Sequence, residues 1–189
     1  MSGPTAPTHC PRGFSLLELL VTLFVVVLIT SMVTLTVSSG GQDIRLASKV
    51  RNLAEVASYA LDEAQMLGLD YGLLLQRTDV SGELVFSYSW RERQPEGWRL
   101  PATGKDVFVE QKMPPEIELQ LELEDVPVAE LTLAGGEEEA APQVVLYASG
   151  ETTAGAIDVR RRDDGELLWR VEWDLLGRFE LLRRGEATD

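Results

Sequence analysis

The stretch RGFSLLELLVTL, residues 12–23, opens an apolar run that extends to Val37. From Phe14 to Val37 there are 24 residues and a single charged side chain, Glu18. As an α-helix this run would be about 36 Å long at ~1.5 Å per residue, enough to cross the ~30 Å hydrocarbon core of a bilayer. A carboxylate inside such a segment is costly, so we expect Glu18 to have a partner and a function.

The residues before the apolar run do not form an ordinary secretory signal. Such signals place the apolar segment before a cleavage site of small residues, whereas here Gly13 precedes it. A cut after Gly13 would remove a polar leader, residues 1–13, and keep the hydrophobic helix. Arg12 and the free amino terminus favour a cytoplasmic leader, with the rest of the chain across the membrane.

The charge of the chain argues against a nucleic-acid partner. The formal net charge of the 189 residues is −14, and removal of the leader with Arg12 would leave about −15. A field of this sign repels phosphate backbones. The local exceptions are arginines at 160–162 and 183–184, which are expected to lie on solvated strands and loops.

Carboxylates are abundant after Gly13, but two other residue types used in catalytic and zinc sites are missing there. The only histidine and the only cysteine, His9 and Cys10, both lie in the predicted leader. The mature chain would therefore have no disulfide, cysteine nucleophile, Cys/His zinc site or histidine-based triad. The acidic stretch 163–166 lacks the alternating oxygen ligands of a calcium loop and fits a hairpin turn better. We predict no enzyme activity, no metal site and no cofactor.

A second helical segment follows the anchor. Gly40-Gly41 is expected to interrupt the helix, as a flexible joint or a local melt, and Gly68 is expected to cap its end. Between them, apolar residues recur every three or four positions, which predicts a helix packed on its own domain, with a partner-helix surface as the alternative. The predicted buried stripe is Ile44, Ala47, Val50, Leu53, Ala54, Ala57, Ala60, Leu61 and Ala64.

After Gly68 the period changes to two, which is typical of strands with one apolar face. Three alternating sets are clear: Leu84, Phe86, Tyr88 and Trp90; Ile117, Leu119, Leu121 and Leu123; Leu167, Trp169, Val171 and Trp173. The acids of 116–124 are expected on a solvated face, and the four tryptophans in the core. Weaker strands are predicted at 71–76, 107–110, 128–133, 143–147, 156–160 and 178–182.

These patterns predict an α+β fold, in which a long N-terminal helix, first transmembrane and then amphipathic, packs on an antiparallel β domain of two sheets. The predicted divisions are a leader at 1–13, an anchor and assembly helix at 14–38, an amphipathic helix at 39–68 and a β domain at 69–189.

Residues 12–23 resemble the class III signal of type IV pilins and type II secretion pseudopilins. Later segments are similar to the GspH/FimT group: ALDEAQMLG (60–68), the strands near 71–75 and ending at Trp90, VLYASGETT (145–153), Ile157, and Leu176-Gly177-Arg178. Ala148-Ser149 replaces the proline often found before the glycine of that group's turn. The resemblance implies a pilin-like fold.

The resemblance also implies roles for three residues. A prepilin peptidase would cleave between Gly13 and Phe14, and the new amino terminus at Phe14 would be N-methylated. Glu18 would meet the terminal amine of a neighbouring subunit during assembly. An amine and a carboxylate in hydrocarbon are each costly alone and relieve one another when paired.

The function implied is that of a minor pseudopilin, a non-catalytic subunit at or near the tip of the type II secretion pseudopilus. The chain would be a single-pass protein of the bacterial inner membrane with its β domain in the periplasm. Its implied partners are minor and major pseudopilins, the prepilin peptidase, the inner-membrane assembly platform and secreted exoproteins. The alternative is a FimT-like minor type IV pilin acting in pilus assembly or DNA uptake, supported by the arginines at 160–162 and 183–184.

Overall fold

The computed structural model describes residues 16–101, 106–124, 131 and 140–184, without the side chains of residues 30–42. The chain divides into two compact units, Met1–Ile44 and Arg45–Asp189. The predicted leader, together with Phe14, lies outside the described residues.

A single helix, α1 (Leu16–Leu67), contributes to both units. The backbone is helical at Gly40 and Gly41, so the interruption expected at these glycines is not found. Among the described residues, no helix is long and apolar enough to cross a membrane. Positions 30–38 of the predicted anchor lie outside the described side chains.

The end of α1 agrees with the sequence. The φ of Gly68 is +66°, a left-handed conformation that glycine adopts without a steric penalty. The Leu69 amide then donates a hydrogen bond of 3.2 Å to the carbonyl of Ala64, which satisfies one acceptor of the last turn.

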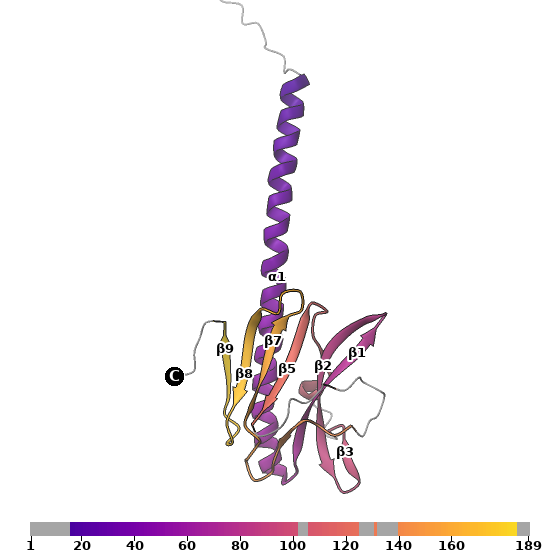
Figure 1. Ribbon diagram of the computed structural model, residues 1–189, viewed down its shortest axis with the longest axis vertical. Helices are drawn as coiled ribbons and strands as arrows, with labels where there is room; N and C mark the ends of the chain where they lie inside the picture. The colour runs from indigo at the N-terminus through magenta and orange to yellow at the C-terminus, as the bar shows by residue number, and fades with distance from the viewer. Residues whose placement is uncertain (1–15, 102–105, 125–130, 132–139, 185–189) are drawn as a thin grey trace, which may run out of the picture. The chain divides into compact units, whose positions relative to one another are not determined.

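Two antiparallel sheets make up the β domain (Figure 1). Sheet A has the order β3-β2-β1-β6, and β4 also pairs with β2; its strands are β1 (Tyr71–Val80), β2 (Glu83–Gln94), β3 (Gly97–Arg99), β4 (Gln111–Lys112) and β6 (Val144–Leu146). Sheet B has the order β5-β7-β8-β9, made of β5 (Ile117–Leu123), β7 (Gly155–Arg161), β8 (Leu167–Trp173) and β9 (Phe179–Arg183). The predicted α+β class with two sheets is confirmed.

The second half of α1 and both sheets share one hydrophobic core. The predicted stripe is buried from Val50 to Ala64, and many of its members are alanine, so the strands approach the helix closely. Ile44 was wrongly included: it belongs to the first unit and is exposed, and the buried positions begin at Leu46. Val56 is also buried, which widens the stripe.

The strand patterns of sheet B are confirmed. In β5, Ile117, Leu119 and Leu121 are buried, and Leu123 is partly buried. In β8, Val171 and Trp173 are buried, whereas Leu167 and Trp169 are only half-buried. Outside sheet B, Trp90 and Trp98 are buried as predicted.

Sheet A departs from the prediction in β2, which is buried on both faces. Phe86, Tyr88 and Trp90 lie on one face as expected, but Leu84 is exposed. Trp98 and Pro142 pack against Gly72 on the opposite face, to which the register also assigns the buried Arg91. The polar residues of β2 therefore suggest an exposed face, but this face is buried because other segments of the chain cover it.

The strand predicted at 107–110 is a 3₁₀ turn instead, η1 (Asp106–Phe108). It inserts Phe108 between aromatic rings of α1 and sheet A, with ring centroids 5.8 Å from Tyr59, 5.4 Å from Tyr71 and 6.0 Å from Trp90. Burying this one ring outweighs the strand preference of its valine neighbours. Of the strand predicted at 128–133, only Leu131 is described, and it is not in a strand.

Tyr88 provides a test of how α1 is held to sheet A. Its hydroxyl donates a hydrogen bond of 3.2 Å to Asn52 Oδ1 on α1. Burial raises the pKa of the Tyr88 phenol. The stability that depends on the neutral phenol is therefore complete below the unfolded pKa of about 10 and is lost as the pH rises from there toward the folded pKa.

We expect Tyr88→Phe to lower the free energy of unfolding at pH 7 by about 1 kcal/mol, the usual value of one hydrogen bond. The variant should also lose less stability than the wild type between pH 9 and pH 11. Urea unfolding followed by tryptophan fluorescence measures both, since all four tryptophans lie after residue 45. Tyr147→Phe, at an exposed tyrosine, is the control, and an equal alkaline loss in Tyr88→Phe would contradict the prediction.

Candidate functional site

The predicted site at the N-terminus is only partly visible in the structure. Gly13 and Phe14 lie outside the described residues, and Glu18 lies in the first turn of α1. A carboxylate in the first turn interacts favourably with the unpaired amides at the start of a helix. Thr22 Oγ1 donates a hydrogen bond to the backbone carbonyl of Glu18, which leaves the carboxylate uninvolved in that bond. The Glu18 side chain is exposed and therefore accessible to another chain.

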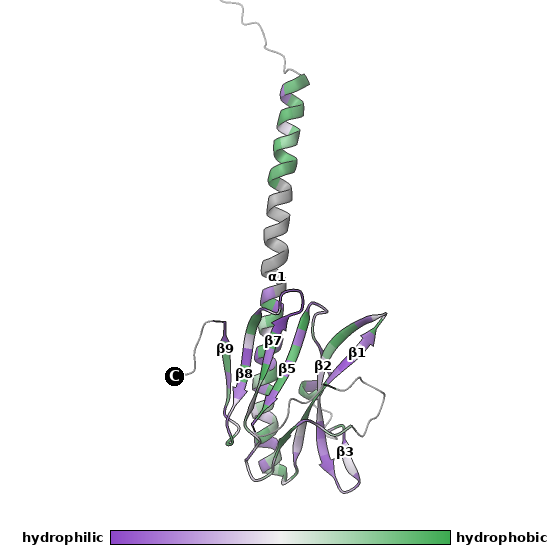
Figure 2. Ribbon diagram, in the orientation of Figure 1, coloured by the Kyte–Doolittle hydropathy of each residue, from purple (hydrophilic) through white to green (hydrophobic). Residues whose placement is uncertain are grey.

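The surface around Glu18 is apolar. Every side chain from Leu16 to Ile29 is exposed, and apart from Glu18 and Thr22 all are large and hydrophobic (Figure 2). Apolar surface left in water forgoes about 25 cal/mol per Å², so the twelve apolar positions of this segment favour lipid or other helices as their surroundings. This segment has the properties of an anchor or of a helix that packs on other helices.

The outer face of sheet B carries a second polar arrangement. Asp158, in the middle of β7, is buried and accepts charge-assisted hydrogen bonds of 2.7 Å from both Arg160 Nη2 and Arg170 Nη1. Arg170 also bonds to Glu122 Oε2 at 3.0 Å and to Glu172 Oε2 at 3.4 Å. One guanidinium thus links β5, β7 and β8 through three carboxylates.

The protonation of this network follows from its geometry. Partial burial alone would lower the pKa of Arg170, but the hydrogen bonds that Arg170 donates to Glu122 and Asp158 outweigh burial and raise it. The guanidinium therefore stays charged and joins the three strands through its carboxylate partners.

The sequence reading missed this network because it treated outward-facing charges as solvated. Glu122 was expected on a free acidic face, yet it is paired with Arg170. The pairing of the strands would have indicated the network. Asp158 lies opposite Arg170 on β8, and two opposite charges that face each other across neighbouring strands stabilise the pair.

The arginines that suggested nucleic-acid binding all have partners within the domain. Arg161 bonds to Asp164 at 3.1 Å and to Glu166, Arg162 donates a bond of 2.6 Å to the Leu84 carbonyl, and Arg160 is held by Asp158. At the chain's other basic pair, Arg183 lies over the ring of Trp169 and Arg184 is paired with Glu166. These side chains are therefore not arranged as a free phosphate-binding surface.

No metal centre is found in the part of the chain that the structure describes: no group of three or more His, Cys, Asp or Glu side chains is arranged to hold an ion. The turn at 163–166 closes the β7–β8 hairpin, with Gly165 at a φ of +69° and its amide bonded to the Arg161 carbonyl at 2.9 Å. It is the hairpin turn predicted from the sequence.

Three comparisons with known proteins bear on this arrangement. Residues 9–34 match the family described as the prokaryotic N-terminal methylation motif. The chain is 26% identical over 187 residues to the type II secretion system protein H of Aeromonas hydrophila, covering 96% of this chain and 98% of that protein.

Two solved structures of the minor pseudopilin EpsH from the type II secretion system of Vibrio cholerae share the fold. One superposes with a TM-score of 0.59 at 19% identity, covering 76% of this chain and 99% of the other. The second gives a TM-score of 0.58 at 21% identity, covering 76% and 96%.

The two sheets and the helix segment packed on them have the fold of the minor pseudopilin EpsH, and the N-terminal motif is that of proteins methylated at the amino terminus. Over nearly its whole length the chain is similar to a type II secretion system protein. The resemblance to the GspH/FimT group predicted from the sequence is confirmed.

The network on sheet B predicts a specific loss of stability. Asp158→Asn removes the negative charge that two guanidinium groups share, while keeping the side-chain volume. We expect the free energy of unfolding to fall by about 3 kcal/mol, because charged partners would remain without their buried counter-ion. Urea unfolding measures the change.

The matched control for this prediction is Glu180→Gln, which removes an exposed carboxylate from β9 of the same sheet. Its effect should stay within about 0.5 kcal/mol, as is usual for surface positions. Equal losses for the two variants would show that the network of Asp158 contributes nothing particular to stability.

Proposed function

We propose that this protein is a non-catalytic structural subunit at or near the tip of a type II secretion pseudopilus, where it helps folded proteins to leave across the outer membrane. The observation that carries the proposal is the methylation motif at 9–34, which includes the start of the exposed apolar helix, in a chain matched over 96% of its length by a type II secretion protein. Cysteine and histidine are both missing from the sequence after Gly13, which supports a structural role.

Maturation would begin at the N-terminus. A prepilin peptidase would cut between Gly13 and Phe14, and methylation would follow at the new amino terminus. The cut leaves an amine four residues before Glu18, at the start of the apolar helix.

Glu18 would then act as the assembly residue. Its carboxylate is exposed in the first turn and surrounded by apolar side chains, so in lipid it is costly until a cation meets it. The terminal amine of a neighbouring subunit supplies that cation, and the surrounding leucines and valines supply the helix–helix contact. The pairing favours the assembled filament over the separate subunit.

The topology follows from the same segment. We place residues 14–38 in the inner membrane as a single-pass anchor, followed by the amphipathic helix to residue 68 and the domain 69–189 in the periplasm. Partners would be other minor and major pseudopilins, the peptidase, the inner-membrane assembly platform and the exported proteins. The internal pairing of the arginines disfavours the DNA-uptake alternative.

The first test addresses processing. We expect Gly13→Ala to retain the leader, because the substitution adds a side chain at the cleavage position, and to reduce export of the system's secreted proteins at least tenfold. Mass spectrometry of the N-terminus and the extracellular level of a secreted protein are the two measurements. Ser15→Ala, two residues away, should be processed normally. Full cleavage and export in Gly13→Ala would reject the proposal.

The second test separates assembly from processing. Glu18→Gln keeps the side-chain volume and removes the charge, so the chain should be cleaved normally while the fraction recovered in pseudopilus complexes falls more than tenfold. The reason is that breaking one low-dielectric ion pair costs roughly 3–5 kcal/mol. Glu55→Gln, on the exposed side of α1, is the control. Normal assembly by Glu18→Gln would remove Glu18 from the proposed role.

A further inference from the structure

The turn between β8 and β9 presents two consecutive leucines to solvent. Leu175 is 61% and Leu176 is 63% exposed. Full burial of one leucine stabilises a protein by about 1.5–3 kcal/mol relative to exposure, so a turn of this kind is usually built from polar residues. The pair therefore forms a small apolar projection at one end of sheet B.

This turn is held in one conformation. Asp174 Oδ1 accepts hydrogen bonds of 3.0 Å from the amides of Leu176 and Arg178, and Asp174 Oδ2 accepts one of 2.6 Å from Arg178 Nε. The amide and guanidinium of Arg178 hold the pKa of Asp174 below its ordinary value, so these bonds persist at neutral pH. The carbonyl of Leu175 is also bound, by the Thr152 amide at 3.0 Å.

Gly177 explains why the leucines point outward. Its φ is +65°, and a Cβ at this position would come within 2.2 Å of Leu61 Cδ2 on α1. The backbone of the turn thus lies directly against the helix. The helix already fills the space on the inner side of the turn, so the two leucine side chains point to solvent. The hydrogen bonds of the turn hold their backbone in place.

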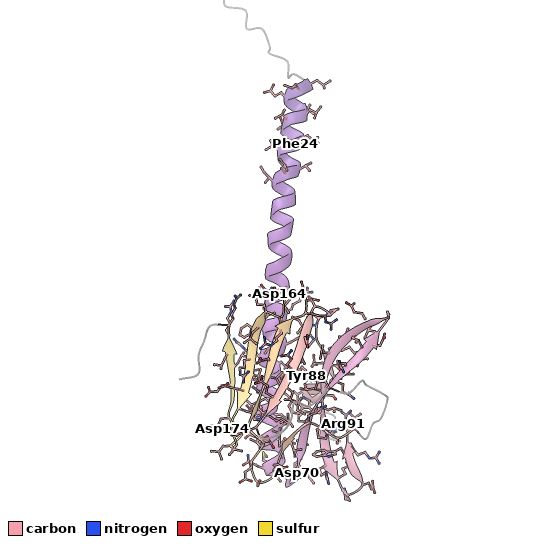
Figure 3. All side chains as sticks on the ribbon, in the orientation of Figure 1. Phe24, Asp70, Tyr88, Arg91, Asp164 and Asp174 are labelled. Atoms are coloured by element: carbon pink, nitrogen blue, oxygen red, sulfur yellow. The ribbon has the colours of Figure 1, made fainter. Side chains whose placement is uncertain are left out.

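A hollow of about 590 Å³ lies beside this turn, at the end of sheet B marked by Asp174 in Figure 3. Gly155 and Ala156 of β7 are among the residues that line it. Five carboxylates line it: Glu122, Glu124, Glu172, Asp174 and Glu180.

The charge of the hollow is not balanced from within. Its two cations are Arg170, which is shared among Asp158, Glu122 and Glu172, and Arg178, which is bound to Asp174. With two guanidinium groups against five carboxylates, the lining has an excess of negative charge. A basic side chain from another protein would be attracted by this excess of negative charge.

We propose that the Leu175–Leu176 turn and the adjacent hollow form a docking surface for a different pilin-like subunit, which places a lysine or arginine in the hollow and apolar side chains on the leucines. The inference rests on the proposed function for the nature of the partner. A second copy of this chain is disfavoured, because two chains that each carry a net charge of −14 repel one another.

The test uses site-directed crosslinking in the full chain. In a Cys10→Ser background, Leu176→Cys provides a single thiol for a maleimide photocrosslinker, applied to membranes of cells that produce every subunit of the system. We expect an adduct whose second component mass spectrometry identifies as another subunit with a prepilin-type N-terminus. The matched control is Val109→Cys. Val109 directly follows η1 and is 56% exposed, and this variant should give at most about a tenth of the adduct.

Charge reversal tests the hollow. Glu124→Lys combined with Glu180→Lys, in the Leu176→Cys chain, should reduce the adduct about tenfold, whereas Glu55→Lys combined with Asp62→Lys on the exposed side of α1 should leave most of it. An unchanged unfolding midpoint shows that the reversed chains are folded. Equal adducts from the Leu176→Cys and Val109→Cys chains, an adduct only with a second copy, or no effect of reversal in the hollow would each overturn the proposal.

The outcomes separate this inference from the proposed function. If the Gly13→Ala and Glu18→Gln variants behave as expected while the Leu176→Cys chain gives no subunit adduct, the docking surface is wrong and the pseudopilin role stands. If those two variants are processed and assembled normally, the pseudopilin role itself is rejected.

Discussion

Close packing of one helix face against two sheets is the interaction on which the domain depends. Ala57, Ala60 and Ala64 are almost completely buried on α1, and their small side chains allow strands of both sheets to approach the helix backbone. The same helix begins with fourteen exposed positions that face no part of the described core. The helix α1 thus has two apolar surfaces. One is buried within the domain, and the other is exposed and favours lipid or other helices as its surroundings.

Much of this division was visible in the sequence, because it depends on local periodicity. The apolar run from Phe14, the stripe from Val50 to Ala64 and the strict alternation of β5 each have a pattern that one kind of element satisfies. Gly68 and Gly165 mark turns because they must adopt positive φ. The N-terminal motif is similarly local, so its three residues were proposed without knowledge of the fold.

What the sequence did not reveal depends on contacts between distant segments. The second face of β2 carries mostly polar residues, yet it is buried, and Trp98 and Pro142 pack on the same side of the sheet from elsewhere in the chain. Asp158 is buried and paired with Arg170, which belongs to the next strand along the chain. The ring of Phe108 turns an expected strand into a 3₁₀ turn. In each case a partner outside the local window decides burial.

The pairing of β1 with β6 has a consequence for how the chain folds. Sheet B is extended by the adjacent β7–β8 and β8–β9 hairpins, and β1 pairs with β2 across a two-residue turn, so these contacts are local. By contrast, the Gln143 side chain bonds both the amide and the carbonyl of Leu75, 68 residues away, at 2.8 and 2.9 Å. Contacts of such separation form late, because a long loop must first be closed. The leucine-rich edge of β1 that faces β6 is therefore uncovered for longest during folding, and an unpaired apolar strand edge of this kind is where a partly folded chain is most prone to associate with another.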